Sequence, residues 1–407
     1  MRILYDVSSA QPQGSMTING GGGYALCVLR HLCRCIDDLK QDIEIELLLN
    51  NKLGTNNAIA ETVENKGFKA SCFSSIPEIT RIISDGQYDV VVFPVCYADY
   101  CEIEISRDVR VITVIHDLAP VYEEMLKTKY GRFIKNDGLN ILRRIKHRLS
   151  APFEIRKAIR KHGRLIRLSD KQVIVTDSDY SKAEIKKYVE GADKKDIEVL
   201  YIPDCSETDE AYDFLDIKEK YRVESGRYFL LVSGCRWTKN NAIVMKALDR
   251  MMGAGGIPEY KTVLLGVDQL YRDYYDRILV NRERFYLEGY VDAKELNTLY
   301  KNARAFIYPS LLEGFGLPPV EAMKHGCVPI CSRAMSIPEV CGEGAVYIDE
   351  QNEESIMKGI EKVLDDTFIS GMRKKGRKRL EELEHRRESD TKKLITLITD
   401  GPKYEED

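Results

Sequence analysis

Residues 308–323 carry the pattern that decides the fold, and they read Tyr308-Pro309-Ser310-Leu311-Leu312-Glu313-Gly314-Phe315-Gly316-Leu317-Pro318-Pro319-Val320-Glu321-Ala322-Met323. An apolar run that begins at Ala305 ends at Tyr308, and a glycine-bearing loop follows it. Pro318 and Pro319 suit the first turn of a helix, and Gly326 suits its end. The stretch therefore predicts a strand, a loop and a helix, which is the repeating unit of a parallel sheet covered by helices.

The same unit recurs in two series along the chain. In the first half the expected strands are Ile3–Tyr5, Ile43–Leu49, Val90–Phe93, Val111–Ile115 and Val173–Thr176. In the second half they are Tyr228–Val232, Val263–Leu265, Phe285–Leu287, Ala305–Tyr308, Val328–Cys331 and Val346–Ile348. Residues 206–210 between the two series are acidic and lack large apolar side chains, which is typical of a linker.

We therefore predict an α/β fold with two doubly wound, Rossmann-like domains and a ligand site at the carboxyl ends of the strands, in a cleft between the domains. The first domain is expected at residues 1–206 and the second at 207–383. The charge-dense stretch 372–393 contains helix formers and no proline, which predicts a long terminal helix. Its last part, about 384–407, is expected to pack back on the first domain.

Composition narrows the class of protein. The 407 residues are 43% hydrophobic and 31% charged, which excludes a wholly disordered chain, and a net charge of −4 gives no overall basic field for nucleic acid. No run approaches the roughly 18 apolar residues of a membrane span, and no leader pattern is evident, so we expect a cytoplasmic protein. The eleven cysteines are irregularly spaced, which indicates reduced thiols rather than disulfides. The sequence contains no pair of Cys-x-x-Cys motifs that would indicate a metal site.

The loop of residues 308–323 has the chemistry of a ligand site. Gly314 and Gly316 let the backbone approach a ligand, and amides at a helix N-terminus suit a diphosphate. Glu313 and Glu321 can accept hydrogen bonds from the hydroxyls of one bound polyol. A helix N-terminus that carries glutamates for its dipole explains the same spacing equally well.

This stretch closely resembles the signature of the retaining glycosyltransferases of family 4, which have the GT-B fold of two Rossmann-like domains facing across a cleft. The resemblance lies in Pro-Ser-x-x-Glu-Gly-Phe-Gly-Leu-Pro-x-x-Glu-Ala-Met, with its two glutamates. It continues at residues 287–291, 295–300, 336–340 and 344–346. It is highly specific from about 284 to 350 and weaker over the rest of the chain.

The resemblance implies roles for residues of the second half. Glu313 would bond the donor sugar and Glu321 the ribose, while Lys239 and Arg236 would hold the diphosphate. Arg236 stands three residues before the lysine rather than at the usual spacing, and a solvated turn is the alternative for both cations. The donor-binding residues that the resemblance implies here are Gly234, Tyr290, Val291, Gly314, Phe315, Gly316, Leu317 and Glu321.

Two motifs of the first half resemble the same family. Residues 19–24 read Asn-Gly-Gly-Gly-Gly-Tyr before an apolar helical segment, and glycines ahead of a helix can admit a phosphate or sugar. A flexible loop is the alternative, whereas the resemblance implies that Gly22 and Gly23 bind the donor. His116 and Asp117 follow a buried strand in a His-Asp-Leu-x-Pro turn. The resemblance implies that His116 is catalytic and contacts the transferred sugar, while Asp117 orders the turn.

Residues 127–168 form a basic amphipathic segment, with 14 Lys or Arg and two acidic residues among apolar residues at near-helical spacing. Such segments are attracted to anionic lipid headgroups. An ordinary solvated pair of helices is the alternative, and RNA is less favoured because aromatic stacking residues are sparse. Members of the family often dock on membranes to reach lipid-linked acceptors, which agrees with the membrane interpretation.

These patterns lead to one main hypothesis. We expect a retaining, metal-independent hexosyltransferase that uses a nucleoside diphosphate sugar and a glycan or lipid-linked glycan acceptor, as in cell-surface polysaccharide synthesis. The resemblance implies no metal or other cofactor, and the charge balance makes nucleic acid an unlikely partner. A sugar-nucleotide epimerase of the same architecture and a non-catalytic binding partner are the alternatives. The identity of the sugar does not follow from the sequence.

Overall fold

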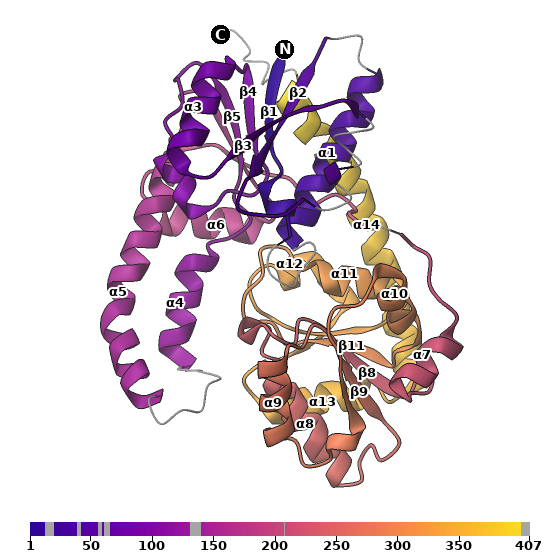
Figure 1. The fold of residues 1–407 in the computed structure, drawn as a ribbon. Helices are drawn as coiled ribbons and strands as arrows, with labels where there is room; N and C mark the ends of the chain where they lie inside the picture. The colour runs from indigo at the N-terminus through magenta and orange to yellow at the C-terminus, as the bar shows by residue number, and fades with distance from the viewer. Residues whose placement is uncertain are drawn as a thin grey trace. The chain divides into compact units, whose positions relative to one another are not determined.

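The computed structural model describes residues 1–12, 20–38, 42–55, 59–60, 66–130, 140–206 and 208–399. These residues form two compact units (Figure 1). Unit 1 comprises the described residues of Met1–Glu124, Ser150–Cys205 and His385–Asp407, and unit 2 comprises those of Met125–Leu149 and Ser206–Glu384.

The described strands of unit 1 form a seven-stranded parallel sheet in the order β3-β2-β1-β4-β5-β6-β7. The strands are β1 Arg2–Asp6, β2 Glu44–Asn50, β3 Lys69–Phe73, β4 Val90–Phe93, β5 Arg110–Val114, β6 Gln172–Thr176 and β7 Ile197–Val199. The helices of the first half are α1 Gly20–Asp38, α3 Ile76–Gly86, α4 Ala119–Tyr130, α5 Asn140–Leu165 and α6 Asp179–Tyr188, with short 3-10 turns η1 Ser8–Ala10, η2 Ala98–Glu102 and η3 Ala192–Lys194.

Unit 2 holds a six-stranded parallel sheet in the order β10-β9-β8-β11-β12-β13. The strands are β8 Tyr228–Leu231, β9 Lys261–Leu264, β10 Phe285–Leu287, β11 Ala305–Tyr308, β12 Pro329–Ser332 and β13 Val346–Ile348. The helices are α7 Phe214–Tyr221, α8 Asn241–Gly253, α9 Gln269–Ile278, α10 Ala293–Asn302, α11 Leu317–Lys324, α12 Ile337–Cys341, α13 Glu353–Lys362 and α14 Asp366–Thr399, with 3-10 turns η4 Trp237–Lys239, η5 Arg282–Arg284 and η6 Gly342–Gly344.

Both sheets reverse their strand order at one point. In unit 1 the chain returns from the β3 edge to pair β4 with the other side of β1, and in unit 2 it returns from β10 to pair β11 with β8. This is the Rossmann strand order, in which a crevice opens where the order reverses. The predicted α/β class with two Rossmann-like domains is confirmed.

The cores explain why these strands read as continuous apolar runs. Every residue of β4, β8 and β11 is buried, because helices cover both faces of each sheet. In unit 2 the helices α8, α9 and α13 place residues such as Val244, Tyr275 and Ile360 against these strands.

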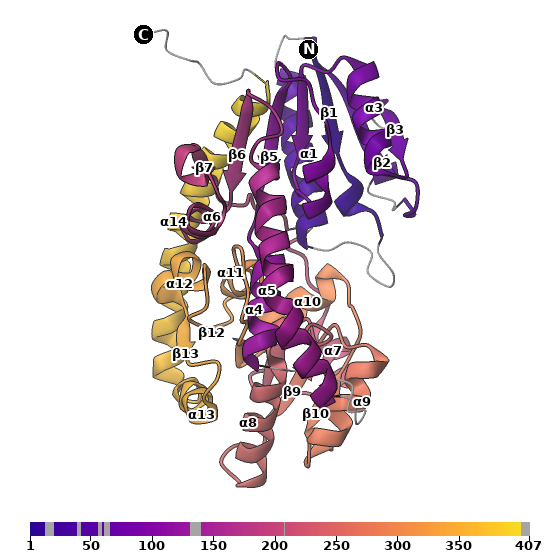
Figure 2. The same cartoon turned by 90° about the vertical axis from the view of Figure 1, so that its left-hand side faces the viewer.

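Two predicted helical segments extend beyond a single unit. The predicted terminal helix is part of α14, 34 residues long, which contributes residues to both units. Its final turns are held within unit 1, where Arg110 donates a hydrogen bond to the carbonyl of Ile398 at 2.8 Å. The basic segment contains α5, the long helix in the middle of Figure 2. Residues 131–139 of that segment, and residues 400–407 of the predicted C-terminal helix, lie outside the described residues.

Two further observations concern the chain as a whole. All eleven cysteines lie in the described ranges, and none of them forms a disulfide. Among the helices of the described residues, none combines the length and apolar character needed to cross a membrane.

Candidate functional site

The predicted site residues of unit 2 meet at the carboxyl ends of its strands, where the strand order reverses. Lys239 ends η4, in the loop that follows β8, and Glu313 lies in the loop after β11, the neighbouring strand. The backbone N–H of Leu311 donates to the carbonyl of Thr238 at 2.8 Å, which ties the two loops together. Residues 74 positions apart in the chain are thereby brought into contact.

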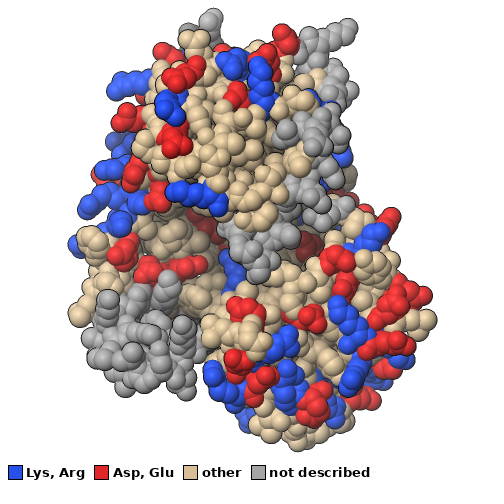
Figure 3. All heavy atoms as spheres, in the orientation of Figure 1, with Lys and Arg blue, Asp and Glu red and all other residues tan. Residues whose placement is uncertain are grey.

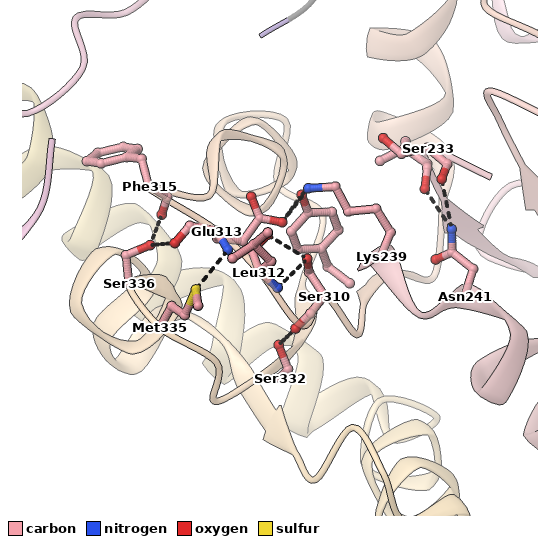
Figure 4. Close-up of polar contacts among 12 residues, drawn as sticks. Ser233, Lys239, Asn241, Ser310, Leu312, Glu313, Phe315, Ser332, Met335 and Ser336 are labelled. Atoms are coloured by element: carbon pink, nitrogen blue, oxygen red, sulfur yellow. Dashed lines mark hydrogen bonds and ion pairs between the residues drawn. The ribbon is translucent and has the colours of Figure 1, made fainter. Parts of the chain in front are cut away.

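Lys239 and Glu313 form a buried ion pair between Nζ and Oε1 (Figure 4). Their side chains are only 9% and 10% exposed. The hydroxyl of Tyr308, the last residue of β11, lies 2.7 Å from Lys239 Nζ and 2.6 Å from Glu313 Oε1. Burial, followed by the charge of Glu313 and the hydrogen bond to it, raises the pKa of Tyr308 well above its ordinary value. The hydroxyl is therefore a neutral donor within the pair.

The loop that carries Glu313 is held by the loop after β12. Figure 4 shows the hydroxyl of Ser336 between two carbonyl oxygens, those of Glu313 and Phe315, at 3.1 Å from each. The N–H of Glu313 donates to Sδ of Met335 at 3.4 Å, and Ser332 Oγ donates to the carbonyl of Ser310 at 2.6 Å. The sequence motif did not indicate these three supports, because they come from a neighbouring strand.

The start of α11 matches the predicted helix. Gly316 precedes the helix in the left-handed region, with φ 97°, a conformation that favours glycine. Of the first three residues of α11, only Leu317 has a backbone N–H, because the next two are prolines. Gly314 and Phe315, which precede the helix, are buried. Glu321 is half-buried and lies in the second turn of the helix, which begins at residue 317.

The loop after β8 contains Gly234, and the packing around it explains why this residue is a glycine. A Cβ on Gly234 would lie 2.5 Å from Val267 Cγ2, so close packing with the next loop requires glycine there, whatever its part in donor binding. Arg236 precedes η4 and is exposed. Asn240, at φ 57°, donates to the carbonyl of Glu350 at 2.7 Å, which fixes the end of η4.

The loops after β9 and β10 are joined to this region through the backbone. The N–H of Val267 donates to the carbonyl of Glu288 at 2.9 Å, and that of Gly266 to Gly289 at 3.0 Å. The next residue, Tyr290, is 54% exposed, and Val291 is half-buried. An exposed tyrosine ring in this place offers a flat apolar surface on which a nucleotide base can stack.

In unit 1, both ring nitrogens of His116 contact protein acceptors. Nδ1 lies 3.0 Å from Asp177 Oδ2, and Nε2 lies 3.0 Å from the carbonyl of Pro94. Burial opposes protonation, but the hydrogen bond and charge of Asp177 outweigh it, so the pKa of His116 is raised. Asp177 thereby favours protonation of His116, and a protonated ring would donate to both groups. In this arrangement neither nitrogen is free to bind a sugar, and its predicted contact with the sugar stays a prediction.

The remaining motifs of unit 1 have structural explanations. Asp117 Oδ1 accepts from the N–H of Ala119 at 2.7 Å, which orders the turn as predicted. The prediction that the glycines precede the first helix is wrong, because Gly22 and Gly23 lie inside α1. A Cβ on Gly22 would lie 2.4 Å from the carbonyl oxygen of Ser9, so glycine is needed for packing there, while one on Gly23 would meet nothing within 4 Å. Asn19 of that motif lies outside the described residues.

No group of three or more His, Cys, Asp or Glu side chains in the described part of the chain is arranged to hold a metal ion. The independence of metal that the resemblance implies stays a prediction. The assignment of individual residues to the donor also stays a prediction.

Comparison with known proteins bears on the family and the fold. Residues 213–382 match the family model of glycosyl transferases group 1. The O-antigen chain mannosyltransferase B of Escherichia coli is 32% identical over 213 residues, which are 49% of this chain and 53% of that protein. The chain therefore aligns with about half the length of this curated relative.

Two solved structures resemble the whole chain at low identity. HepE from Anabaena, in complex with UDP and glucose, has a TM-score of 0.66 at 13% identity and covers 98% of this chain and 100% of its own. Sucrose-phosphate synthase from Thermosynechococcus elongatus has a TM-score of 0.67 at 14% identity and covers 97% of each chain. These likenesses agree with the predicted GT-B architecture. Residues 213–382, which include the ion pair of Lys239 and Glu313, are thus the part of the chain that is similar to the glycosyl transferases group 1 family.

Proposed function

We propose that this protein is a retaining glycosyltransferase that moves a hexosyl group from a nucleoside diphosphate sugar to a hydroxyl of a glycan or lipid-linked glycan. The observation that carries the proposal is the buried pair of Lys239 and Glu313 at the reversal point of a group 1 domain. The mannosyltransferase relative supports a role in cell-surface polysaccharide synthesis and makes mannose the first sugar to test. The solved structure that contains UDP and glucose supports a nucleotide-sugar donor.

The chemistry of the pair suits such a donor. Lys239 has three N–H donors, and within the described ranges it uses two of them, on Tyr308 and Glu313, which leaves one for a diphosphate. A cation and the backbone amide of Leu317 can stabilise the charge that develops on the departing nucleoside diphosphate without a metal ion. In the reaction that we propose, the acceptor attacks from the face on which the diphosphate leaves, and the leaving phosphate takes the acceptor proton. The protein then contributes position and electrostatics rather than a strict general base.

A thermal-shift screen tests this proposal. The purified protein is heated with UDP, GDP, dTDP, ADP or CMP, each with and without EDTA. Ligand at 100 times its dissociation constant stabilises a fold by about 2.7 kcal/mol. We expect one nucleoside diphosphate to stabilise the protein selectively, and EDTA to leave this shift unchanged. A protein that responds to none of them would instead be a non-catalytic binding partner.

A second assay separates the two enzyme functions. The protein is incubated with the sugar nucleotide of the selected base and no acceptor, and the products are examined by NMR. We expect slow hydrolysis in which the anomeric configuration is retained. Isomerised sugar nucleotide would identify an epimerase, and inverted sugar would contradict the retaining mechanism.

We also propose that α5 contacts an anionic membrane at its cytoplasmic face, where a lipid-linked acceptor would be reached. Leu149 and Phe153 are four positions apart on one face of this helix, and their side chains are 78% and 67% exposed. The exposed cations Arg156, Lys157 and Arg160 follow them. Figure 3 shows that on the visible face of unit 2, by contrast, Lys and Arg are interspersed with Asp and Glu. Apolar residues beside cations suit anionic lipid headgroups.

Co-sedimentation with vesicles tests the membrane contact. We expect binding to vesicles of phosphatidylglycerol and much weaker binding to phosphatidylcholine. The double variant Leu149→Ser, Phe153→Ser should bind phosphatidylglycerol vesicles more weakly than the wild type. Leu215→Ser, which removes an equally exposed leucine from α7, is the matched control and should leave binding unchanged. Equal binding by all three proteins would contradict the proposal.

A further inference from the structure

Tyr308 is a residue that the predicted site did not include, although it touches both charged members of that site. Its hydroxyl lies 2.7 Å from Lys239 Nζ and 2.6 Å from Glu313 Oε1. Its ring is buried and stacks on Phe306 with centroids 5.6 Å apart and an interplanar angle of 27°. The ring therefore belongs to the core, whereas the hydroxyl belongs to the site.

The directions of these hydrogen bonds follow from the groups themselves. An ammonium can only donate, and a carboxylate can only accept. The hydroxyl of Tyr308 must therefore accept from Lys239 and donate to Glu313. The three groups form a closed ring of hydrogen bonds, and both bonds to Glu313 fall on Oε1. Within the described part of the chain, Glu313 Oε2 accepts no hydrogen bond, so it is the oxygen available to a ligand.

A bound donor changes what Lys239 can do in this ring. A diphosphate competes with Glu313 for the ammonium, and the carboxylate is then held less firmly by Lys239. The hydroxyl of Tyr308 does not compete for the phosphate in the same way, because its proton already points to Oε1. It is the remaining group that can hold Glu313 in place.

We propose that Tyr308 is a positioning residue that anchors Oε1 of Glu313 while Lys239 binds the diphosphate, so that Oε2 stays directed at the donor sugar. This inference rests on the proposed function and adds a residue to it. A purely structural role for Tyr308 is the competing explanation, since its ring fills the core.

Tyr308→Phe separates these explanations because it keeps the ring and removes the hydroxyl. Tyr228→Phe is the matched control. Tyr228 is a buried tyrosine of the neighbouring strand β8, and its hydroxyl donates to the carbonyl of Leu299 at 2.6 Å, away from the ion pair. Tyr308→Phe removes the two hydrogen bonds of its hydroxyl and Tyr228→Phe removes its bond to Leu299, and thermal unfolding shows whether both variants remain folded.

The test is a double-mutant cycle with Glu313→Ala, which removes the acceptor of the Tyr308 hydroxyl, measured on hydrolysis of the sugar nucleotide selected in the thermal-shift screen. A hydrogen bond to a charged group corresponds to about a tenfold effect or more, so Tyr308→Phe should lower kcat at least about tenfold. Its Kd for the matching nucleoside diphosphate should change less than about threefold, since the diphosphate contacts Lys239. In the Glu313→Ala background the same substitution should change both kcat and the Kd of the sugar nucleotide by less than about twofold.

Three results would overturn the inference. One is a Tyr308→Phe protein that turns over as fast as Tyr228→Phe. Another is a loss of the same size with and without Glu313, which indicates a structural role. The third is a wild-type protein that binds no nucleoside diphosphate and hydrolyses no sugar nucleotide, which overturns the proposed function together with this inference.

Discussion

Removing the charge of Glu313 should destabilise unit 2 far more than removing the charge of an exposed glutamate. The side chains of Lys239 and Glu313 are 9% and 10% exposed, so Glu313→Gln leaves a cation in a shielded place without its counter-charge. Breaking a buried ion pair from one side costs about 3–5 kcal/mol. The glutamine carbonyl and the hydroxyl of Tyr308 can still accept hydrogen bonds from the ammonium. We therefore expect a loss near the lower end, about 3 kcal/mol.

The chain carries a suitable probe for this measurement. Trp237 is the single tryptophan of the sequence and lies in η4, two residues before Lys239. Urea unfolding followed by its fluorescence therefore reports on unit 2 at the site. The matched control is Glu259→Gln, whose partner Arg227 belongs to the same unit. The two side chains of that pair are 60% and 49% exposed, so its loss should cost less than about 1 kcal/mol.

A second substitution tests whether the unpaired charge of Lys239 causes the loss of stability. Lys239→Met in the Glu313→Gln background removes the charge that was left unpaired, so stability should recover part of the loss. If Glu313→Gln unfolds like Glu259→Gln, the pair is not shielded from water and the reasoning from burial is wrong. If the double variant is less stable than Glu313→Gln, the cation was not the cause of the loss.

The remaining predictions concern ligand affinity, pH and backbone packing. Glu313→Gln should bind the selected nucleoside diphosphate more tightly than wild type in a titration of Trp237 fluorescence, because no carboxylate competes for Lys239. The pKa of His116 is raised, so its stabilising effect is complete below the unfolded pKa of about 6.5 and is lost as the pH rises through the folded value. Urea unfolding followed by circular dichroism should show a loss of stability from pH 6 to 8.5 that is smaller in His116→Gln. By the same assay, Gly22→Ala should lower the free energy of unfolding by about 1–3 kcal/mol, because its Cβ would clash with Ser9. Gly23→Ala meets no such clash and should raise the free energy of unfolding by about 0.5–1 kcal/mol. Similar values for the two variants would contradict the packing explanation.

Strands that are continuous apolar runs could be predicted from the sequence, including the edge strands β10 and β13 of unit 2, whereas the edge strands β3 and β7 of unit 1 could not. Predicted and observed bounds agree at Val90–Phe93, Phe285–Leu287, Ala305–Tyr308 and Val346–Ile348, each of which is a continuous run of apolar or aromatic residues. The two missed strands, β3 and β7, are the edges of the sheet in unit 1. In β3 only Phe73 is buried, and β7 has a glutamate, Glu198, between its two apolar residues, so neither strand contains a continuous apolar run.

The candidate site was predictable where a motif is local and not where contacts join distant loops. The motif indicated Glu313 and Lys239, because each follows a recognisable strand. It did not indicate that they pair with each other, since this depends on β8 and β11 being neighbours. Tyr308 was counted as the end of a strand, because a sequence pattern registers the apolar ring and not the direction of the hydroxyl. A sequence signal for Tyr308 does exist. It is a tyrosine at the carboxyl end of a buried strand, five residues before the glutamate of the motif.

The pairing of Lys239 with Glu313 has a consequence for selectivity among ligands. The resemblance assigns these residues to different parts of the donor, yet in this structure each neutralises the other. A ligand that draws the ammonium away must supply enough negative charge to offset the lost ion pair in a shielded place. A diphosphate can do so, whereas a nucleoside has no charge to offer and a monophosphate has less. The buried pair thus favours ligands that carry the diphosphate, and it does so before any contact with the base or the sugar is considered.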